Sequence, residues 1–368
     1  MKYYIISGEA SGDLHGSNLI KQLHLIDSTA NIRCWGGDLM QSKGATLVKH
    51  YRDLAFMGFA EVVMNLGTIL KNIKFCKKDI LSYKPDVLIL IDYPGFNIRI
   101  AEWAKKEGIK TVYYISPQIW AWKENRVHTI KKYVDKMIVI LPFEKDFYSK
   151  WDYRVHYAGH PLIEVIDDFK AAYNQPETSG EKIIALLPGS RKQEINVKLP
   201  VMLEVSQAFP EYTFVVAKAP GVEDVFYEPF LAKYKNVSAL AGKTYDVLNQ
   251  ATAALVTSGT ATLEAALFGV PEVVCYKGNP LSYQIAKWVI KVKYISLVNL
   301  IMDKSVVKEL IQAEMTAENC IKELKDLLNN PVRKLQLEKD YRDLKNLLSL
   351  GGDASANAAK IIYKFVQE

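Results

Sequence analysis

Long hydrophobic runs are absent from this chain of 368 residues. A transmembrane helix needs ~18 or more consecutive apolar residues, and no stretch approaches that length. The apolar stretch Tyr3–Ser7 near the N-terminus is too short for the core of a secretory signal peptide. We therefore expect neither a membrane-spanning helix nor a signal sequence.

Patterns typical of metal sites and disulfide frameworks are also missing. The four cysteines are scattered and form no C-x-x-C pair, which argues against structural zinc and favours a reducing cytosol. The chain contains no D-x-D motif. We therefore predict that no metal ion bridges a bound diphosphate, and we predict no cofactor. The cysteines are Cys34, Cys76, Cys275 and Cys320.

A strong excess of one charge is lacking as well. The 47 basic and 41 acidic residues leave a net charge of +6. A dedicated nucleic-acid binder usually shows a dense basic stripe. The mild balance instead favours an anionic substrate or an anionic membrane surface, and no nucleic acid.

What the sequence does contain is a repeated alternation of short apolar runs and helical segments. The hydrophobic content of 49% is that of a folded protein, and the length predicts two domains. After residue 297 the pattern becomes helical, over 317–328, 332–348 and 354–366. The expected strands are Tyr3–Ser7, Arg33–Gly37, Asp86–Ile91, Thr111–Ile115, Lys136–Leu141, Val155–Ala158, Ile183–Leu187, Thr213–Ala217, Val237–Ala239, Ala253–Thr257 and Glu272–Tyr276.

A polar segment divides this alternation into two runs. Tyr173–Lys182 contains Pro and Gly and has no periodicity, as is typical of a linker. Two successive α/β runs predict two Rossmann-like, doubly wound domains facing a cleft. We expect the domains at 1–172 and 183–330, with C-terminal helices at 331–368 packing back toward the first domain.

The stretch Ala253–Glu264 reads A-A-L-V-T-S-G-T-A-T-L-E and predicts a strand, a tight turn and a helix. The turn is Ser258, Gly259 and Thr260, and we expect Ser258 or Thr260 to cap the helix. Free N–H groups at a helix N-terminus favour phosphate. Glu264 lies about one turn further on and is placed to accept hydrogen bonds from a ribose. The alternative is an ordinary strand–turn–helix with a surface glutamate.

A second turn of the same kind follows Ile183–Leu187. It reads Pro188-Gly189-Ser190-Arg191, and the arginine adds a fixed charge that can bind phosphate oxygens. Two such turns in one domain, together with Glu264, favour a nucleoside diphosphate.

The first domain instead gathers acidic residues at its strand ends. The turn Gly8–Asp13 carries Glu9 and Asp13 and does not have the G-x-G-x-x-G spacing, so we favour a carbohydrate over a dinucleotide there. Asp92 follows the buried run Asp86–Ile91, where ligands of open α/β sheets bind. Asp92 is equally placed to cap the next helix.

Together these motifs resemble the lipid-A-disaccharide synthase family, inverting glycosyltransferases of the GT-B fold (glycosyltransferase family 19), nearly end to end. The matching motifs are G-E-A-S-G-D at Gly8–Asp13, M-G-F-A-E-V at Met57–Val62, S-P-Q-I-W-A-W at Ser116–Trp122, L-P-F-E at Leu141–Glu144, G-H-P-L at Gly159–Leu162, L-P-G-S-R at Leu187–Arg191 and S-G-T-A-T-L-E at Ser258–Glu264.

The resemblance implies transfer of 2,3-diacylglucosamine from UDP-2,3-diacylglucosamine to 2,3-diacylglucosamine 1-phosphate. The products are lipid A disaccharide 1-phosphate and UDP, formed at the cytoplasmic face of the inner membrane. It further implies that Arg191 and Glu264 serve UDP, with Asn299 and Gln312 near the cleft. We also consider a homodimer.

Three positions depart from the family pattern. The family's D-x-P-D-F-N has a second Asp proposed for catalysis, and here that position is Gly95. His15 and Lys308 replace an aliphatic residue and a Pro. The general base is therefore expected among Asp92 first, Asp13 second and Glu9, with His15 last.

Met64–Ile80 is a basic amphipathic segment, with Leu66, Ile69, Leu70 and Ile73 at helical spacing. From the sequence alone we favour a crossover helix packed on the sheet. The resemblance favours a membrane contact instead, because both substrates carry acyl chains. Leu281–Leu297 is a second basic and aromatic segment, for which we expect core packing.

Two other functions stay open from the residues. A hydrolysing UDP-N-acetylglucosamine 2-epimerase shares the expected architecture and would need no acylated acceptor. A non-catalytic UDP-sugar-binding protein would bind UDP without turnover, although it has no need of acidic residues such as Asp92.

Overall fold

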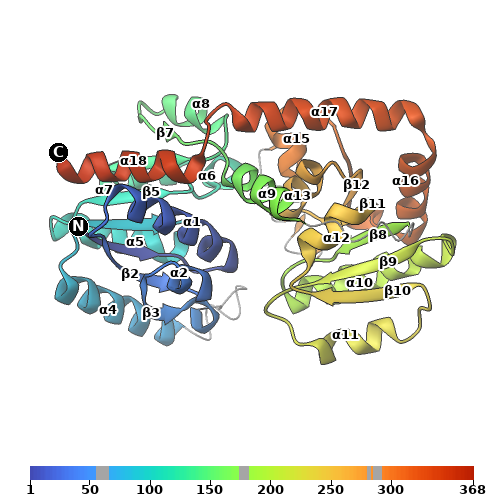
Figure 1. Ribbon diagram of the computed structural model, residues 1–368, viewed down its shortest axis with the longest axis horizontal. Helices are drawn as coiled ribbons and strands as arrows, with labels where there is room; N and C mark the ends of the chain where they lie inside the picture. Colours follow the sequence, from blue (N-terminus) through green and yellow to red (C-terminus); the bar gives the residue numbers. More distant parts are fainter. Residues whose placement is uncertain (55–65, 174–181, 280–282, 285–291) are drawn as a thin grey trace. The chain divides into compact units, whose positions relative to one another are not determined.

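The computed structural model describes residues 1–54, 66–173, 182–279, 283–284 and 292–368. The chain forms two compact units, one of Met1–Pro161 with Leu348–Glu368 and one of Leu162–Leu347 (Figure 1). Below we call them unit 1 and unit 2.

Unit 1 is built on a seven-stranded parallel sheet in the order β3-β2-β1-β4-β5-β6-β7. Residue Ile6 of β1 pairs with Leu90 of β4, so the carboxyl ends of these two strands are neighbours. The strands are β1 (Lys2–Ile6), β2 (Asn31–Gly36), β3 (Thr46–His50), β4 (Val87–Ile91), β5 (Thr111–Tyr114), β6 (Lys136–Val139) and β7 (His156–Tyr157).

Helices cover this sheet and complete the doubly wound pattern. The last helix, α18, packs against α1 within unit 1, and Lys110 Nζ donates to the carbonyl of Phe365 near its end at 3.2 Å. The helices are α1 (Ala10–Ile26), α2 (Asp38–Ser42), α4 (Leu66–Tyr83), α5 (Pro94–Lys106), α6 (Ile119–Trp122), α7 (Arg126–Tyr133), α8 (Glu144–Ser149) and α18 (Ala354–Gln367), with a 3-10 turn at Tyr51–Leu54.

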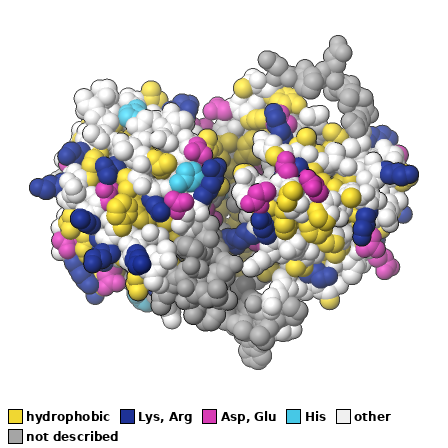
Figure 2. All heavy atoms as spheres, turned by 90° about the horizontal axis from the view of Figure 1, so that it is seen from below, with side chains coloured by type: hydrophobic (Ala, Val, Ile, Leu, Met, Phe, Trp, Pro, Cys, Tyr) yellow, Lys and Arg dark blue, Asp and Glu magenta, His cyan; other side chains and the backbone are white. Residues whose placement is uncertain are grey.

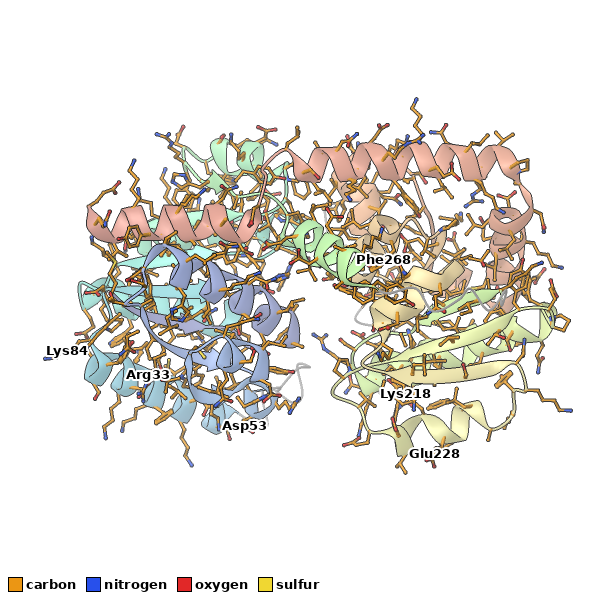
Figure 3. All side chains as sticks on the ribbon, viewed as in Figure 1. Arg33, Asp53, Lys84, Lys218, Glu228 and Phe268 are labelled. Atoms are coloured by element: carbon orange, nitrogen blue, oxygen red, sulfur yellow. The ribbon has the colours of Figure 1, made fainter. Side chains whose placement is uncertain are left out.

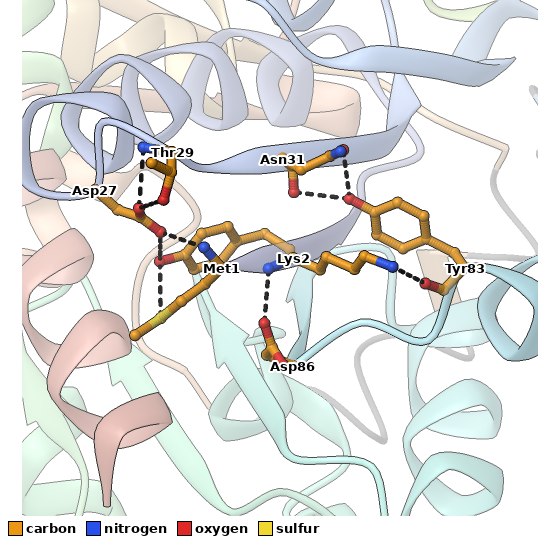
Figure 4. A network of polar contacts seen from close by, with 8 residues as sticks. Met1, Lys2, Asp27, Thr29, Asn31, Tyr83 and Asp86 are labelled. Carbon is orange, nitrogen blue, oxygen red and sulfur yellow. Dashed lines mark hydrogen bonds and ion pairs between the residues drawn. The ribbon is translucent and has the colours of Figure 1, made fainter.

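The central strand β4 is apolar along its whole length. All five of its residues are buried, as expected for a parallel strand covered on both faces. Polar contacts instead fix the amino end of β1. The Met1 ammonium pairs with Asp27 at 2.9 Å and the Lys2 N–H donates to Asp86 at 2.7 Å (Figure 4).

Unit 2 contains a six-stranded parallel sheet in the order β10-β9-β8-β11-β12-β13. Strands β8 and β11, which precede the two predicted phosphate turns, lie side by side. The strands are β8 (Ile183–Leu187), β9 (Thr213–Lys218), β10 (Val237–Ala241), β11 (Ala251–Thr257), β12 (Glu272–Tyr276) and β13 (Lys308–Ile311).

The helices of unit 2 follow its strands in the same alternating way. They are α9 (Pro161–Ala172), α10 (Lys192–Val205), α11 (Asp224–Leu231), α12 (Thr244–Gln250), α13 (Thr260–Phe268), α15 (Leu297–Met302), α16 (Ala317–Asn329) and α17 (Pro331–Ser349), with 3-10 turns at Ser206–Ala208 and Gln312–Glu314.

The boundaries between the two units differ from the domain boundaries expected from the sequence. Helix α9 joins unit 2, because Phe169 packs against Phe268 (labelled in Figure 3) with ring centroids 5.8 Å apart and Lys170 donates to the Leu267 carbonyl. Of the C-terminal helices expected to return to the first domain, only α18 does so, while most of α17 belongs to unit 2.

The packing of helix α4 shows that two of the residues expected to face a membrane lie against the core instead. Ile73 is 8% exposed and lies in the core of unit 1, and Ile69 packs against that core. These two side chains are therefore not available to a membrane. Leu70, at 55% exposed, does face outward. Leu66 begins the helix, but its side chain lies outside the described residues.

The outward face of α4 still carries apolar side chains among lysines. Phe75 and Leu81 are 47% and 48% exposed, and the exposed Lys71, Lys74 and Lys78 lie on the same helix between Leu70 and Leu81. Figure 2 looks onto this side of unit 1, where lysine and arginine side chains are interspersed with hydrophobic ones. Among the helices of the described ranges, none is long and apolar enough to span a bilayer.

Some predicted features lie outside the described residues. These are the motif Met57–Val62, the first two residues of Met64–Ile80, nearly all of the linker Tyr173–Lys182, and most of the amino-terminal half of Leu281–Leu297.

Candidate active site

In unit 1 the carboxyl ends of β1 and β4 bring Glu9 and Asp92 near each other. The buried side chain of Asn97, on the following helix α5, fixes both strand ends. Its Nδ2 donates to the carbonyls of Ile6, Ile91 and Asp92 at 3.4, 3.2 and 2.8 Å. Glu9 is the N-cap of α1, in extended backbone, so it directly follows the β1 turn.

The backbone at Asp92 is strained. Asp92 and Tyr93 have φ values of 43° and 49°, a left-handed conformation that residues other than glycine rarely adopt. Gly8 approaches the ring of Tyr93 so closely that a Cβ on Gly8 would lie 2.4 Å from it. Tyr113 also donates its hydroxyl to the Asp92 carbonyl. Packing thus holds Asp92 in a conformation that the chain would not otherwise choose.

The electrostatic setting of Asp92 suits a proton acceptor. Burial, with a smaller contribution from the Glu9 carboxylate, raises the pKa of Asp92 to about 7. A carboxyl group with a pKa near the working pH is an effective general base. Asp92 caps no helix with its side chain, since α5 has Tyr93 at its N-cap position and no side-chain cap.

Asp13 has a different role from the one expected from the sequence. It is 3% exposed, and its two carboxylate oxygens accept hydrogen bonds from the N–H groups of Gly37, Leu39 and Met40 at 2.8–3.1 Å. Because these bonds occupy both oxygens, Asp13 fixes the turn between β2 and α2. We therefore do not assign proton transfer to it.

Two buried histidines and a buried glutamate complete this part of unit 1. Burial lowers the pKa of His15 to about 4, and burial together with His15 lowers the pKa of His160 to about 3. Glu144 is 1% exposed and accepts from the N–H groups of Ile140 and Leu141. Burial raises the pKa of Glu144 to about 7. The L-P-F-E and G-H-P-L motifs contain Glu144 and His160, but no spacing marked these two residues as buried.

In unit 2 the turn after β11 has an open helix N-terminus. Helix α13 starts at Thr260, and its N-cap is Gly259, with φ 146° and no side-chain cap. This corrects the expected cap, because the Ser258 hydroxyl instead donates to the Ile295 carbonyl at 2.7 Å. Gly259 and Thr260 are exposed, and a Cβ on Gly259 would meet no atom within 4 Å. The turn can therefore accept an anion against its backbone.

Glu264 lies deeper, one turn into α13. Burial raises the pKa of its carboxyl group, while the Tyr245 hydroxyl donates to Oε1 at 3.0 Å and lowers it. Among the described residues no hydrogen bond is seen to Oε2, so one oxygen is left for a ribose hydroxyl. Tyr245, on α12, holds the Glu264 carboxylate in place through this bond, and no motif in the sequence pointed to it.

The turn after β8 combines a left-handed glycine with charged side chains. Gly189 has φ 123°, and Arg191 is the N-cap of α10. The Arg191 guanidinium lies 3.5 Å from Glu194 Oε1 and is 49% exposed. Ser190 is exposed beside it. The two predicted phosphate turns thus follow the adjacent strands β8 and β11.

Asn299 and Gln312 differ in their availability to a ligand. The Asn299 side chain is fully buried, with Oδ1 accepting from two backbone N–H groups and Nδ2 donating to Val307 O and Glu309. It therefore orders the following loop rather than offering its amide to a nucleotide. Gln312 has φ 55°, and its Oε1 accepts from the Gly278 N–H. Its Nε2 is buried and donates to no residue in the part of the chain that the structure describes.

No group of three or more His, Cys, Asp or Glu side chains is placed to hold a metal ion within the described ranges. That no metal ion bridges the bound diphosphate stays a prediction.

Comparisons with known proteins identify the family. Residues 3–364 match the family model described as lipid-A-disaccharide synthetase. A lipid-A-disaccharide synthase from Geobacter metallireducens is 38% identical over 371 residues, covering 98% of this chain and 96% of that protein. One from Syntrophus aciditrophicus is 39% identical over 369 residues, covering 96% and 95%.

Solved structures agree on the fold. A UDP-GlcNAc 2-epimerase from Neisseria meningitidis, bound to UDP-GlcNAc, has a TM-score of 0.67 at 14% identity, with both chains covered completely. The glycotransferase of kitacinnamycin has a TM-score of 0.68 at 16% identity, covering 99% of each chain. These likenesses confirm the predicted GT-B fold class, with two Rossmann-like parallel-sheet domains.

The hydrogen bonds of Asp13 predict that it is a structural residue. Asp13→Asn replaces one acceptor oxygen by an NH₂ group facing backbone N–H donors. We expect the free energy of unfolding to fall by about 1–3 kcal/mol, measured by urea denaturation. Asp38→Asn, at a carboxylate 66% exposed, is the matched control and should change stability little. A loss at Asp13 no larger than at Asp38 would contradict this role.

Proposed function

The chain belongs to the lipid-A-disaccharide synthase family and is a glycosyltransferase of lipid A disaccharide synthesis, and from this premise we propose which residues serve each substrate. The match over residues 3–364 and the 38% identity over nearly the full length carry the family assignment. The donor is a UDP-sugar and the acceptor a lipid. In finer detail they are UDP-2,3-diacylglucosamine and 2,3-diacylglucosamine 1-phosphate.

Unit 2 binds the UDP part of the donor. The adjacent turns at Gly189–Arg191 and Ser258–Thr260 offer backbone N–H groups, and Arg191 offers a half-exposed guanidinium. Glu264 accepts from the ribose, with Tyr245 orienting its carboxylate. Gln312, whose buried Nε2 has no hydrogen-bond partner among the described residues, is a further contact. Asn299 acts indirectly, through the loop that it orders.

Unit 1 supplies the general base for an inverting transfer. The acceptor hydroxyl attacks the anomeric carbon of the donor on the face opposite UDP. The new C–O bond forms as the bond to UDP breaks, and the hydroxyl proton passes to Asp92. UDP leaves with the electron pair, stabilised by Arg191 and the helix N-termini. The raised pKa of Asp92 is the observation that supports this assignment.

The two alternatives are less well supported. The epimerase from Neisseria meningitidis shares the fold at 14% sequence identity, and a likeness at that level is no evidence that this chain has epimerase activity. A non-catalytic UDP-sugar-binding protein would have no use for a strained, buried carboxylate such as Asp92. The discriminating assay is UDP release from the diacylated donor, measured with and without the diacylated acceptor phosphate.

The outward face of α4 is the proposed contact with the cytoplasmic face of the inner membrane. This replaces the face expected from the sequence, because Ile69 and Ile73 pack on the core. Leu70 and Leu81 are eleven residues apart, which is close to three helical turns, so they lie on the same side. Exposed lysines between them suit anionic lipid headgroups.

The UDP assignment predicts that losing the arginine charge and losing the ribose contact change ligand binding in different ways. Arg191→Ala should weaken UDP binding by about 1.5–3 kcal/mol, the range for a hydrogen bond to a charged group. Glu264→Gln should weaken UDP but leave pyrophosphate binding nearly unchanged. Calorimetric titration measures both, with the exposed Arg342→Ala on α17 as control. Equal losses for UDP and pyrophosphate in Glu264→Gln would refute the ribose role.

The base assignment predicts a pH-dependent rate. Asp92→Asn should lower the rate at saturating substrates by about 10²–10⁴-fold. Because the pKa of Asp92 is raised to about 7, the wild-type rate should increase with pH through that region. Glu9→Gln removes a negative neighbour, so it should move this rising limb to lower pH. If Asp92→Asn retains more than about a tenth of the rate, Asp92 is not the base.

A gain-of-function variant complements this test. A Cβ added to Gly95 would meet no atom within 4 Å, so Gly95→Asp should fold normally and place an acid at the family's second Asp position. We expect Gly95→Asp to restore part of the rate lost in Asp92→Asn. No recovery in the well-folded double variant would show that position 95 cannot supply the base here.

The α4 face predicts a membrane-binding variant that stays folded. Replacing Leu70 and Leu81 by Ser should weaken sedimentation with anionic vesicles by about tenfold or more, since each leucine loses a partly buried apolar contact. The melting temperature should be unchanged, whereas Ile73→Ser should lower it. Serines at the exposed Val332 and Leu335 of unit 2 are the control. Unchanged vesicle binding in the Leu70 and Leu81 variant would exclude this face.

A further inference from the structure

Lys198 of helix α10 is a buried cation next to the proposed UDP turns. It is 3% exposed, and it is the one basic residue other than histidine that is buried in the described parts of the chain. Removing an ammonium group from water is costly unless other groups compensate the charge. A lysine in this position therefore needs an explanation beyond packing.

The contacts of Lys198 point to the same turns. Its Nζ donates to the hydroxyl of Thr257, the last residue of β11, which directly precedes the Ser258–Thr260 turn. Its ion-pair partner is Glu194, with Oε2 3.9 Å away. Burial lowers the pKa of Lys198, and the nearby Arg191 lowers it further. One neutral hydroxyl and one carboxylate at the limit of an ion pair compensate the charge only in part.

Glu194 lies in the first turn of α10, which follows the turn after β8. A Cβ added to Gly189, which has φ 123°, would lie 2.4 Å from Glu194 Oε2. Its other oxygen, Oε1, lies 3.5 Å from Arg191. The carboxylate thus occupies the space that the glycine leaves open, within reach of both Arg191 and Lys198. Its side chain is 34% exposed, so it can move outward without disturbing the core.

We propose that Glu194 is an internal anion that the donor diphosphate displaces, and that Lys198 is a positioning residue whose buried charge favours the diphosphate. With the turn empty, Glu194 pairs with Arg191 and Lys198. When a phosphate oxygen takes its place over Gly189, both cations face the more highly charged diphosphate. Lys198 acts through the Thr257 hydroxyl and through its field, without leaving the interior. This inference rests on the proposed UDP site.

The test compares UDP with uridine, which lacks the phosphates, by calorimetric titration of the full chain. Lys198→Met keeps the length and apolar stem of the side chain but removes the charge, and it should weaken UDP binding at least tenfold while changing uridine binding less than twofold. Glu194→Gln removes the competing anion and should tighten UDP binding severalfold, again without effect on uridine. Lys170→Met, at an exposed lysine of unit 2 whose Nζ donates to Leu267 O, is the control and should change neither.

The outcomes separate this inference from the proposed function. If wild type binds UDP no better than uridine, the UDP site itself is refuted. If Arg191→Ala weakens UDP but Lys198→Met does not, the site stands and the role of Lys198 is refuted. Weaker UDP binding in Glu194→Gln would show that Glu194 supports the nucleotide rather than competing with it. Should Lys198→Met melt early, Glu194→Gln still decides, because its side chain is partly exposed.

Discussion

The constraint on which this structure depends is that its central parallel strands are buried along most of their length. Such strands cannot carry a polar side chain without a large cost, so polar groups gather where the strands end. In unit 1 the strand β4 is entirely buried and Asp92 is the next residue. In unit 2 the buried strand β8 leads into Gly189 and Arg191. Both proposed halves of the site arise from this one rule.

The same rule explains which parts of the fold could be predicted from the sequence. The apolar runs Ile183–Leu187 and Glu272–Tyr276 became strands with the predicted bounds. The strands β3 and β13 were missed, because they lie at sheet edges and carry polar residues that break the apolar pattern. Periodicity predicted the α4 helix but not its buried side, since both faces of that helix carry apolar residues.

The positions of the site residues could be predicted from the sequence, but their roles could be predicted much less well. The sequence places Asp13 and Asp92 after neighbouring strands. Only the structure shows that backbone N–H groups bind the carboxylate oxygens of Asp13 and that the backbone of Asp92 is strained. Asn299 was placed near the site by resemblance, and its amide proved to be saturated by its own loop. Lys198 gave no signal, because a lysine within a helical stretch is ordinarily exposed.

The two units also differ in the charges they hold near their strand ends, and this difference matches the chemistry of glycosyl transfer. Near Asp92, burial and, to a smaller extent, the Glu9 carboxylate favour the protonated form of the Asp92 carboxyl group, so that Asp92 can accept a proton near neutral pH. Near Gly189 the Glu194 carboxylate is paired with Arg191 and Lys198, and these two cations favour an anion. An inverting transfer releases a proton from the acceptor and a negative charge on the leaving diphosphate. In the proposed mechanism the proton passes to the shielded carboxylate at the end of β4, and the diphosphate is held beside the cations that follow β8, so each event has an environment that favours it.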